Sequence, residues 1–600
     1  MRNPERVLNS LTEHSNDALY KYDRLYRILF NEEMFYVAYQ RIYAKQGNMT
    51  AGSDGKTIDE MSLSRIEQLI TSLKDESYQP QPSRRVYIPK KNGKMRPLGV
   101  PTFNDKLVQE VVRMILEAIY EGSFEHSSHG FRPNRSCHTA LAYIKRAFNG
   151  AKWFIEGDIK GFFDNINHDV LINVLKERIA DERFLRLIRK FANAGYIEDW
   201  KFHKTYSGTP QGGIISPILA NIYLDKLDKY MEEYIINFDC GKGRKRNLEC
   251  RRLESKKRKT VKHLRSVEDE SERIELMEQI KTISKQIFQI PYGNEMDTNY
   301  KRMKYVRYAD DFIIGIIGSK DEARKIKEDI AKYLQEKLKL ELSEDKTLIT
   351  HSEKPALFLG YEVAVWKSNF IKRNAAGNLS RTVNKIVRLG IPKNMIKHKL
   401  LEYDAVELKN HDGVERWKPK ARSILIDNES LEILYRYNAE IRGIYNYYAL
   451  ANNCSTLNSF KYIMEYSMYK TFAWKYRTSV KKLCTKYKKD GIFTISYTDS
   501  KGRNKQATFY NKGFRKRIPD VESKYDNLPF VAFGLSYTSL TDRLKERKCE
   551  LCGATEDMEM HHIRKLKDLK GKADWQKVMI ARQRKTIAVC RPCHMKIHYG

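Results

Sequence analysis

Two adjacent carboxylates stand where a strand would turn back on itself. Asp310 and Asp311 lie between apolar, β-prone runs at residues 305–306 and 312–317. Like charges held beside apolar strands repel each other, and a divalent cation relieves that repulsion. A third acid, Asp158, ends another strand-like run. Taken alone, the pair also fits a solvated turn, but the three acids together predict a cage for two Mg²⁺ ions and the chemistry of nucleotidyl transfer.

A second set of chemically active residues lies near the end of the chain. Two Cys-x-x-Cys pairs supply four thiolates, which at this spacing predict a tetrahedral Zn²⁺ site. The four residues are Cys549, Cys552, Cys590 and Cys593.

Histidines accompany these cysteines. His594 and His598 are one helical turn apart and would share a helix face, so with His561 they are predicted to bind a second, catalytic divalent cation. His562 is then left to activate water. The alternative is a zinc finger that only binds DNA.

The sequence predicts some of the elements that must position these residues. A basic hairpin is expected over residues 84–101, around Asn92-Gly93. Its cations suit a triphosphate, with a solvated hairpin as the alternative. Residues 206–217 form a glycine-containing loop that opens a helix at Ser216-Pro217.

The spacing of apolar residues predicts helices in other parts of the chain. The first 80 residues are expected to be helical, with amphipathic spacing from Met61. Residues 240–290 are predicted to be a helical surface insertion that either clamps RNA or is simply solvated. Past residue 361 the strand-like pattern fades, and an aromatic-rich helical period with a basic edge begins at Leu431.

Composition limits the class of protein. A formal net charge of +34 over 600 residues predicts a polyanionic partner, namely nucleic acid. We find neither an apolar stretch long enough for a membrane span nor a signal peptide, and therefore expect no membrane partner and an intracellular protein. Nine cysteines in so long a chain indicate a reduced compartment with a metal site.

The ordered motifs resemble those of group II intron-encoded reverse transcriptase/maturase proteins over nearly the whole chain. The resemblance rests on the segments 96–101, 129–133, 157–164, 209–213, 308–311 and 358–361. It implies a multidomain α+β fold with a right-hand polymerase of fingers and palm, a helical maturase thumb and a small zinc-bound HNH (ββα-metal) module.

The resemblance also implies domain boundaries. They are 1–80 for an N-terminal extension with fingers helices, 81–375 for the fingers and palm, 376–490 for the maturase thumb, 491–545 for a DNA-binding region and 546–600 for the HNH endonuclease. The stretch 491–545 has little periodicity of its own.

The same resemblance assigns residues to roles. The three acids occupy the family's metal-binding positions. Lys90 and Arg96 fall where fingers cations meet the incoming triphosphate, and Gln211 lines the nucleotide pocket. Phe163 matches the bulky side chain that excludes a 2′-hydroxyl, which favours dNTPs over NTPs.

The C-terminal pattern resembles an HNH nuclease finger, with one departure. The position five residues before Cys590, where the family usually has asparagine, is Lys585. Whether the nuclease is active therefore stays open.

The function expected is RNA-directed DNA polymerase that binds its own group II intron RNA, assists its splicing and cuts a target DNA strand. One alternative is an RNA-binding maturase with vestigial polymerase or endonuclease activity, and another is an RNA-dependent RNA polymerase. We expect the protein in a bacterial cytoplasm or nucleoid, with an organelle as the alternative. A homodimer is left open.

Overall fold

The computed structural model describes most of the chain. The described residues are 3–599 without 44, 46, 48, 90–92, 94, 199–200, 204–211, 295–296, 369, 374–376, 378, 382, 500–501 and 518–538. No helix within this described part has both the length and the apolar character needed to cross a bilayer.

A four-stranded antiparallel sheet with the order β7-β8-β4-β9 forms the centre of the chain. Its strands are β4 (Trp153–Asp158), β7 (Arg302–Tyr308), β8 (Asp311–Ile317) and β9 (Leu348–His351). Along β8, Ile314 and Ile316 belong to one hydrophobic core and Ile313 to another. Because side chains alternate between the faces of a strand, both faces of this sheet are buried.

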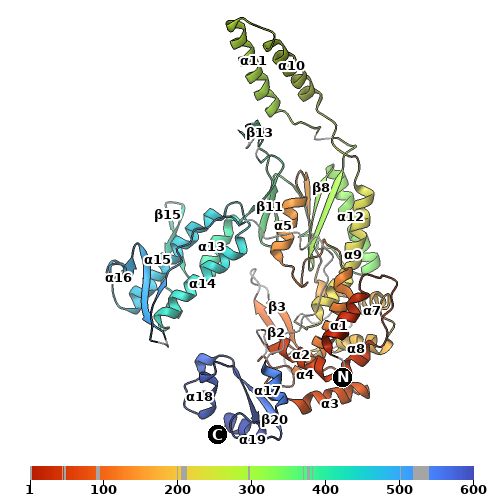
Figure 1. Cartoon of the computed structure of the whole chain (residues 1–600), viewed down its shortest axis with the longest axis vertical. Coiled ribbons are helices and arrows are strands. Elements are labelled where there is room, and N and C mark those ends of the chain that lie inside the picture. The colour runs from red at the N-terminus through yellow and green to blue at the C-terminus, as the bar shows by residue number, and fades with distance from the viewer. Residues whose placement is uncertain are drawn as a thin grey trace.

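Helices cover the two faces of the central sheet (Figure 1). One face packs on α9 (Ser216–Phe238) and α12 (Lys320–Leu338), and the other on α5 (Cys137–Ala147). Other helices of this half include α1 (Pro4–Glu13), α4 (Phe103–Tyr120), α6 (Phe162–Asn165), α7 (His168–Lys176) and α8 (Glu182–Asn193).

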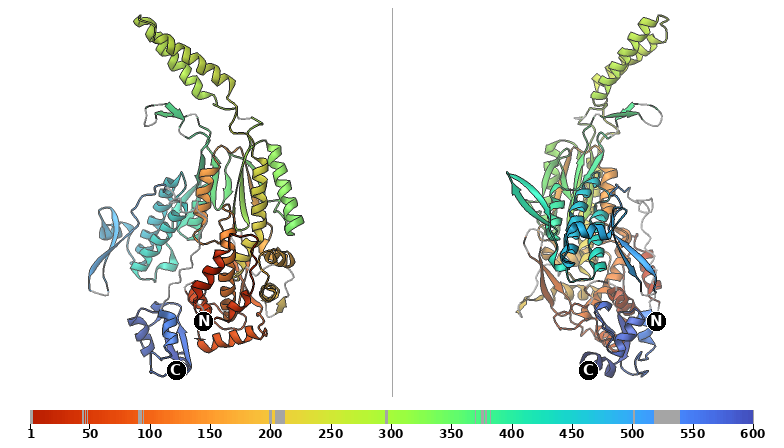
Figure 2. Two further views of the ribbon diagram at one scale, coloured as in Figure 1. Left: turned by 45° about the vertical axis from the view of Figure 1, so that its right-hand side comes forward. Right: turned by 90° about the vertical axis from the view of Figure 1, so that its left-hand side faces the viewer.

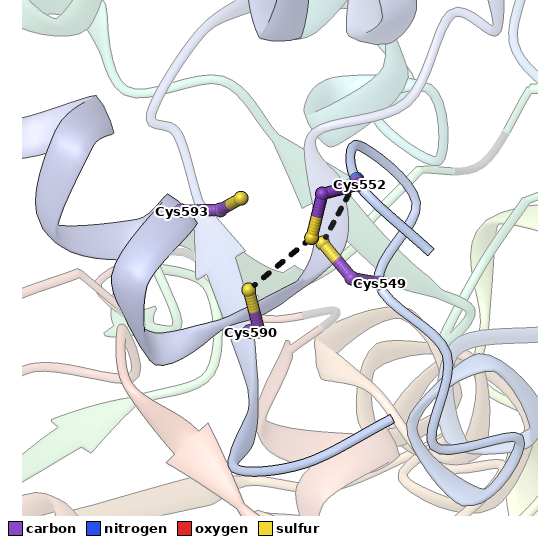
Figure 3. A group of neighbouring side chains, drawn as sticks. All are labelled: Cys549, Cys552, Cys590 and Cys593. Atoms are coloured by element: carbon purple, nitrogen blue, oxygen red, sulfur yellow. Dashed lines mark hydrogen bonds between the residues drawn. The ribbon is translucent and has the colours of Figure 1, made fainter. Parts of the chain in front are cut away.

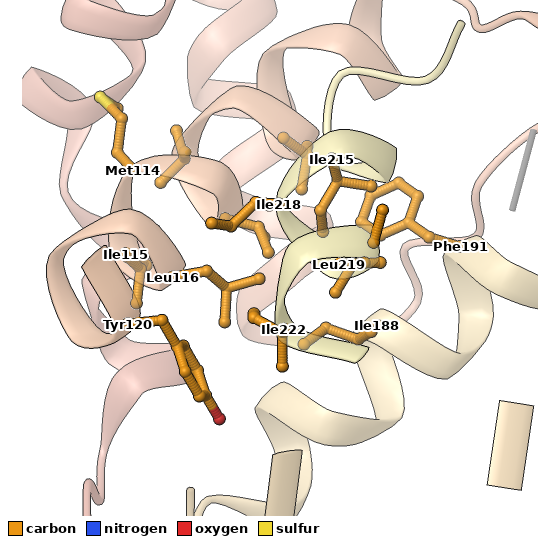
Figure 4. Close-up of a cluster of buried hydrophobic side chains, with 14 of the residues drawn as sticks. Met114, Ile115, Leu116, Tyr120, Ile188, Phe191, Ile215, Ile218, Leu219 and Ile222 are labelled. Carbon is orange, nitrogen blue, oxygen red and sulfur yellow. The ribbon is translucent and has the colours of Figure 1, made fainter. Parts of the chain in front are cut away.

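The first turns of α9 are anchored in a cluster of aliphatic side chains (Figure 4). Ile215, Ile218 and Leu219 are buried there, next to Leu116 of α4 and Ile188 of α8. Burial of such side chains stabilises by about 1.5–3 kcal/mol each. This packing fixes the start of α9 against α4 and α8.

The hairpin expected over residues 84–101 is present as β2 (Ser83–Pro89) and β3 (Met95–Val100). It lies in a sheet of order β3-β2-β5-β6 with β5 (Tyr196–Glu198) and β6 (Lys201–His203). The tip of the hairpin falls outside the described residues.

The helical insertion expected at residues 240–290 is also present. It consists of α10 (Leu248–Leu264) and α11 (Glu270–Gln289), which pair side by side and project away from the body of the molecule (Figure 2). In α10 only Cys250 is buried, and in α11 only Leu276 and Ile283. The hairpin thus presents nearly all of its side chains to solvent.

The expectation that strands fade past residue 361 is wrong. The strands found there are β11 (Tyr361–Val365), β12 (Ile371–Arg373), β13 (Leu379–Arg381), β14 (Val387–Gly390), β15 (Val406–His411) and β16 (Val414–Pro419), and β10 (Ala356–Phe358) lies just before them. Most are short, and the β15–β16 ribbon exposes residues on both of its faces. Such strands lack the apolar alternation that sequence analysis relies on.

A helical bundle is also present in this region, as expected. It contains α13 (Lys393–Glu402), α14 (Ser430–Tyr448), α15 (Leu457–Lys475) and α16 (Val480–Tyr487). A three-stranded sheet of β17 (Lys488–Lys489), β18 (Ile492–Thr498) and β19 (Asn504–Thr508) then occupies part of the stretch that showed little periodicity.

The C-terminal module packs against the N-terminal helices (Figure 1). It contains α17 (Ser539–Lys545), β20 (Met558–His562), α18 (Asp574–Ala581), β21 (Thr586–Cys590) and α19 (Arg591–Tyr599). Its neighbours are α2 (Glu32–Tyr43), α3 (Leu63–Lys74) and β1 (Met61–Ser62). Met61, expected in a helix, instead lies in β1, which adds a third strand to β20 and β21.

Candidate active sites

The central sheet brings the three predicted acids together. Asp158 ends β4 and Asp311 begins β8, and the two are directly paired across the ladder. Ala309 has a left-handed φ of 58°, which forms the tight turn that places Asp310 next to them. Gly157 makes this register possible, because a Cβ there would lie 2.1 Å from the Phe312 ring.

Burial and mutual repulsion raise the pKa values of two of these acids, as expected where carboxylates would bind a cation. Burial, followed by the charges of Asp310 and Asp158, raises the pKa of Asp311 to about 7. Burial also raises the pKa of Asp310. Lys346, 2.7 Å from Asp158 Oδ2, supplies a positive charge, and this hydrogen bond raises the pKa of Lys346. The acids therefore repel each other, and divalent cations fit the donor set.

A buried arginine that the sequence analysis did not identify supports the acidic turn. Arg307 is fully buried and donates from Nε to Asp228 Oδ1 at 2.7 Å. It also donates from Nη1 to the carbonyl oxygen of Ala309 at 2.9 Å and from Nη2 to Ser128 Oγ at 2.7 Å. The guanidinium thus connects α9, which carries Asp228, to the backbone of the turn.

The 129–133 motif also serves this turn. His129 donates its backbone N–H to the carbonyl oxygen of Arg307 at 2.9 Å. Gly130 lies so close to the turn that a Cβ would be 2.3 Å from the backbone nitrogen of Ala309. Asn221 of α9 donates to the carbonyl oxygen of Gly130 at 2.8 Å. The motif therefore packs against the turn and helps to fix the position of the acids.

Replacing Asp228 with alanine should destabilise the region around the acids, since it leaves the Arg307 charge buried without its partner. We expect the free energy of unfolding to fall by about 3–5 kcal/mol, as measured by urea denaturation. Asp321→Ala, which removes an exposed partner of Arg324, should change it by at most about 1 kcal/mol. Equal losses in the two variants would contradict the role given to Arg307.

Of the four residues predicted to contact the nucleotide, the structure describes Arg96 and Phe163. Arg96 lies in β3, close enough for its charge to act on Asp310. Phe163 is half-buried in α6, and its ring meets that of Phe162 edge-on at 5.2 Å. Lys90 and Gln211 fall outside the described residues.

The four cysteines converge as predicted (Figure 3). Their sulfur atoms all lie within 4.8 Å of one another, with Cys552 Sγ 3.5 Å from Cys590 Sγ. Burial acts against a thiolate at Cys549, but backbone N–H groups outweigh it and lower the pKa of Cys549 to about 6. Burial and neighbouring thiols raise the pKa of Cys593. This crowding of sulfurs fits a cation that binds thiolates.

The three predicted imidazole ligands also meet. His561 comes from β20, and His594 and His598 share one face of α19. His594 Nε2 lies 3.1 Å from His561 Nδ1 and 3.2 Å from His598 Nε2. On its other side, His594 Nδ1 contacts Glu559 Oε2 at 2.6 Å. A carboxylate behind an imidazole is a common arrangement at metal sites.

The hydrogen bonds of His562 fix which of its ring nitrogens could accept a proton. Its Nδ1 is 2.9 Å from the carbonyl oxygen of Met560, which can only accept, so Nδ1 carries the proton. Its Nε2 is left to accept from the Tyr39 hydroxyl at 2.9 Å. Burial lowers the pKa of His562, which keeps the ring neutral. Tyr39 therefore occupies the lone pair that would receive a proton from water.

Residues of the N-terminal region reach this centre, and sequence reasoning missed them. Asp59 contacts the imidazole cluster, and Tyr39 contacts His562. No spacing rule connects residues about 500 positions apart in sequence, so no signal in a single chain could have identified them.

A basic cleft of about 850 Å³ runs between the N-terminal region and the C-terminal module, with His562 in its wall. The basic residues that line it are Lys45, Arg543, Arg564, Lys565, Arg584 and Lys585. Lys585, the residue at the usual asparagine position, thus lies on the cleft. A phosphate backbone is the ligand that such a surface suits.

Comparison with known families agrees with this geometry. Residues 88–248 and 274–363 match the reverse transcriptase (RNA-dependent DNA polymerase) family, residues 384–525 the type II intron maturase family, and residues 549–594 an AI2M/AI1M-like HNH endonuclease family.

Whole proteins match as well. The chain is 45% identical to the group II intron-encoded protein LtrA of Lactococcus lactis subsp. cremoris over 99% of this chain and 98% of that protein. It is 35% identical to the putative COX1/OXI3 intron 2 protein of Saccharomyces cerevisiae over 99% of this chain and 68% of the relative. A telomerase structure from Candida albicans aligns at a TM-score of 0.30 with 14% identity over 72% of this chain and 66% of that one, a likeness that carries no argument.

The chain belongs to the family of group II intron-encoded proteins. It is a reverse transcriptase and maturase with an HNH endonuclease domain, which confirms these parts of the predicted function and the predicted multidomain α+β class. Its partner is RNA, and its two enzymatic domains are of kinds that use divalent metals.

Proposed function

We propose that the protein copies its intron RNA into DNA from the 3′ end of a target DNA strand that its own HNH domain has cut. The observation that carries this proposal is the presence of two separate cation-type centres in one chain. One is the acid set on β4 and β8, and the other is the imidazole set on β20 and α19.

In the polymerase centre, we assign cation binding to Asp158, Asp310 and Asp311. When bound, two Mg²⁺ ions lower the pKa of the primer 3′-hydroxyl and stabilise the pyrophosphate leaving group. We assign Lys90 and Arg96 to offsetting the charge of the incoming triphosphate and Gln211 to contacting the nucleotide. Arg307 holds the acidic turn in place through its bond to the Ala309 carbonyl oxygen.

In the nuclease centre, the four cysteines hold structural Zn²⁺ and His561, His594 and His598 hold a divalent cation. His562 takes a proton from the attacking water after that water displaces Tyr39. Target DNA enters by the basic cleft, whose cations pair with its phosphates.

We divide the chain among these tasks at the boundaries expected from the sequence. Residues 1–80 extend the fingers, 81–375 form the fingers and palm, 376–490 the RNA-binding thumb, 491–545 a DNA-binding region and 546–600 the nuclease. We place the protein in a bacterial cytoplasm or nucleoid, where its target DNA is present.

Phe163→Ala should raise incorporation of rNTPs relative to dNTPs, because it opens room for a 2′-hydroxyl. One extra group in an apolar pocket changes discrimination by about 10–200-fold. The test is competition between a dNTP and the matching rNTP on one RNA template. Phe162→Leu, a change in the buried neighbouring ring, is the control for altered packing alone.

An unchanged ratio in Phe163→Ala would remove the gate role. If the unmodified protein extended the primer with rNTPs alone, an RNA polymerase would be indicated. If it extended with neither, the vestigial maturase would be the better account.

A further inference from the structure

The carboxylate of Asp59 lies among the three imidazoles of the nuclease centre. Its Oδ1 is 3.4 Å from His561 Nδ1 and 3.3 Å from His594 Nε2, and its Oδ2 is 3.0 Å from His598 Nε2. One donor atom from each of these four residues lies within 4.8 Å of all the others. The four donors are therefore close enough to one another to share one cation.

The segment that carries Asp59 is fixed on the C-terminal module. Ile58 and Met61 are fully buried, and Met61 pairs with Met560 across the β1–β20 ladder. Asp59 Oδ1 also accepts the backbone N–H of His562 at 2.8 Å. Glu60 has a φ of 64°, which residues with a side chain rarely adopt. These contacts fix the turn and hold the Asp59 carboxylate against the C-terminal module.

Contacts farther out hold the two regions together. Gln40 of α2 donates to Thr541 Oγ1 at 2.7 Å, and Lys545 Nζ lies 2.8 Å from Glu33 Oε1. These contacts mean that the position of Asp59 does not depend on the imidazoles alone.

We infer that Asp59 is the fourth ligand of the nuclease cation and that this cation joins the N-terminal region to the HNH module. The inference rests on the proposed nuclease function. Asp59 supplies an oxygen donor beside the three imidazole nitrogens. Three imidazoles and one carboxylate suit a first-row transition cation better than Mg²⁺.

The opposing explanation is a hydrogen-bonded cluster that binds no cation. In that case a protonated His594 bridges Asp59 and Glu559 as an ion-paired link between the two regions. The two explanations differ in whether removing the Asp59 carboxylate changes metal affinity.

The test is a Co²⁺ titration of the full chain with zinc already in its cysteine site, followed by the visible absorption of four-coordinate Co²⁺. Asp59→Ala should weaken Co²⁺ binding by at least about tenfold, because loss of even a group that only orients a metal ligand costs about that much in affinity. Asp59→Asn keeps the volume and the acceptor for the His562 N–H but should also weaken binding. Glu60→Gln, which changes the exposed neighbouring carboxylate, should bind as the unmodified protein does.

A second measurement reports on the contact between β1 of the N-terminal region and β20 of the C-terminal module. Co²⁺ should slow amide hydrogen exchange in β1 and β20 of the unmodified protein, and should not do so in Asp59→Ala. The zinc content of the cysteine site, measured in the same samples, shows that the module is folded. Unchanged Co²⁺ affinity in both Asp59 variants with zinc retained would overturn the inference.

Failure of this inference can be told apart from failure of the proposed nuclease. If Co²⁺ binding depends on Asp59 but no metal supports DNA nicking, the ligand assignment stands and the nuclease proposal falls. If nicking occurs and Co²⁺ binding is indifferent to Asp59, the nuclease proposal stands and the ligand assignment falls.

Discussion

Asp310→Asn should reduce cDNA synthesis by more than about a thousandfold while the protein still assists splicing. The change removes a charge next to Asp311 and Asp158 but almost no volume, so the turn held by Arg307 should persist. Splicing depends on the metal site of the RNA and needs the protein as a scaffold. Primer extension and intron splicing by one protein preparation measure the two effects together.

The matched control is Asp321→Asn. Asp321 lies on the exposed surface of α12, where it pairs only with Arg324 among the ion pairs of the described residues. This variant should retain both activities. If Asp310→Asn extended a primer as fast as the control, the assignment of the acids would be wrong.

His562→Ala should reduce cleavage of target DNA by about 10²–10⁴-fold, the usual contribution of a general base. Zinc content should be unchanged, because the cluster that holds the zinc consists of the four cysteines (Figure 3) and His562 is not one of its members. Cys549→Ser should instead unfold the module, since structural zinc supplies folding free energy. A labelled target strand, analysed for nicks, gives the cleavage rate.

Reverse transcription from a pre-nicked primer should survive both changes, because the polymerase acids belong to the central sheet. His411→Ala, in the exposed β15–β16 ribbon, controls for loss of an arbitrary histidine. Nicking by His562→Ala at the rate of this control would mean that another residue is the base or that the module only binds DNA.

Local patterns allowed much of both sites to be predicted. Asp158 ends one strand and Asp311 begins another, and the apolar residues of these strands fix the register, so the pairing of the two acids follows from strand patterning. The hairpin of β2 and β3 follows from its turn residues, and the pairing of His594 with His598 follows from the helical period. Each of these depends on neighbours within a few residues or on one strand pairing.

Long-range partners could not be predicted. The ion pair between Arg307 and Asp228 joins a strand to a helix 79 positions away, and either residue alone resembles an ordinary surface charge. Asp59 acts on histidines about 500 residues away because β1 pairs with β20. A two-residue strand has no periodicity to detect, so the contact between the two regions is visible only in the fold.

The central claim is that cleavage and copying are successive steps performed by two centres of one chain. The direct measurement uses the protein bound to its intron RNA, a target DNA duplex labelled at the 5′ end of the cut strand, and dNTPs. The account predicts a shorter labelled fragment that then lengthens into a product containing intron-complementary DNA, with Asp310→Asn stopping at the fragment and His562→Ala leaving the strand whole. A labelled fragment that never lengthens in the unmodified protein, although the same protein extends an annealed primer, would contradict it.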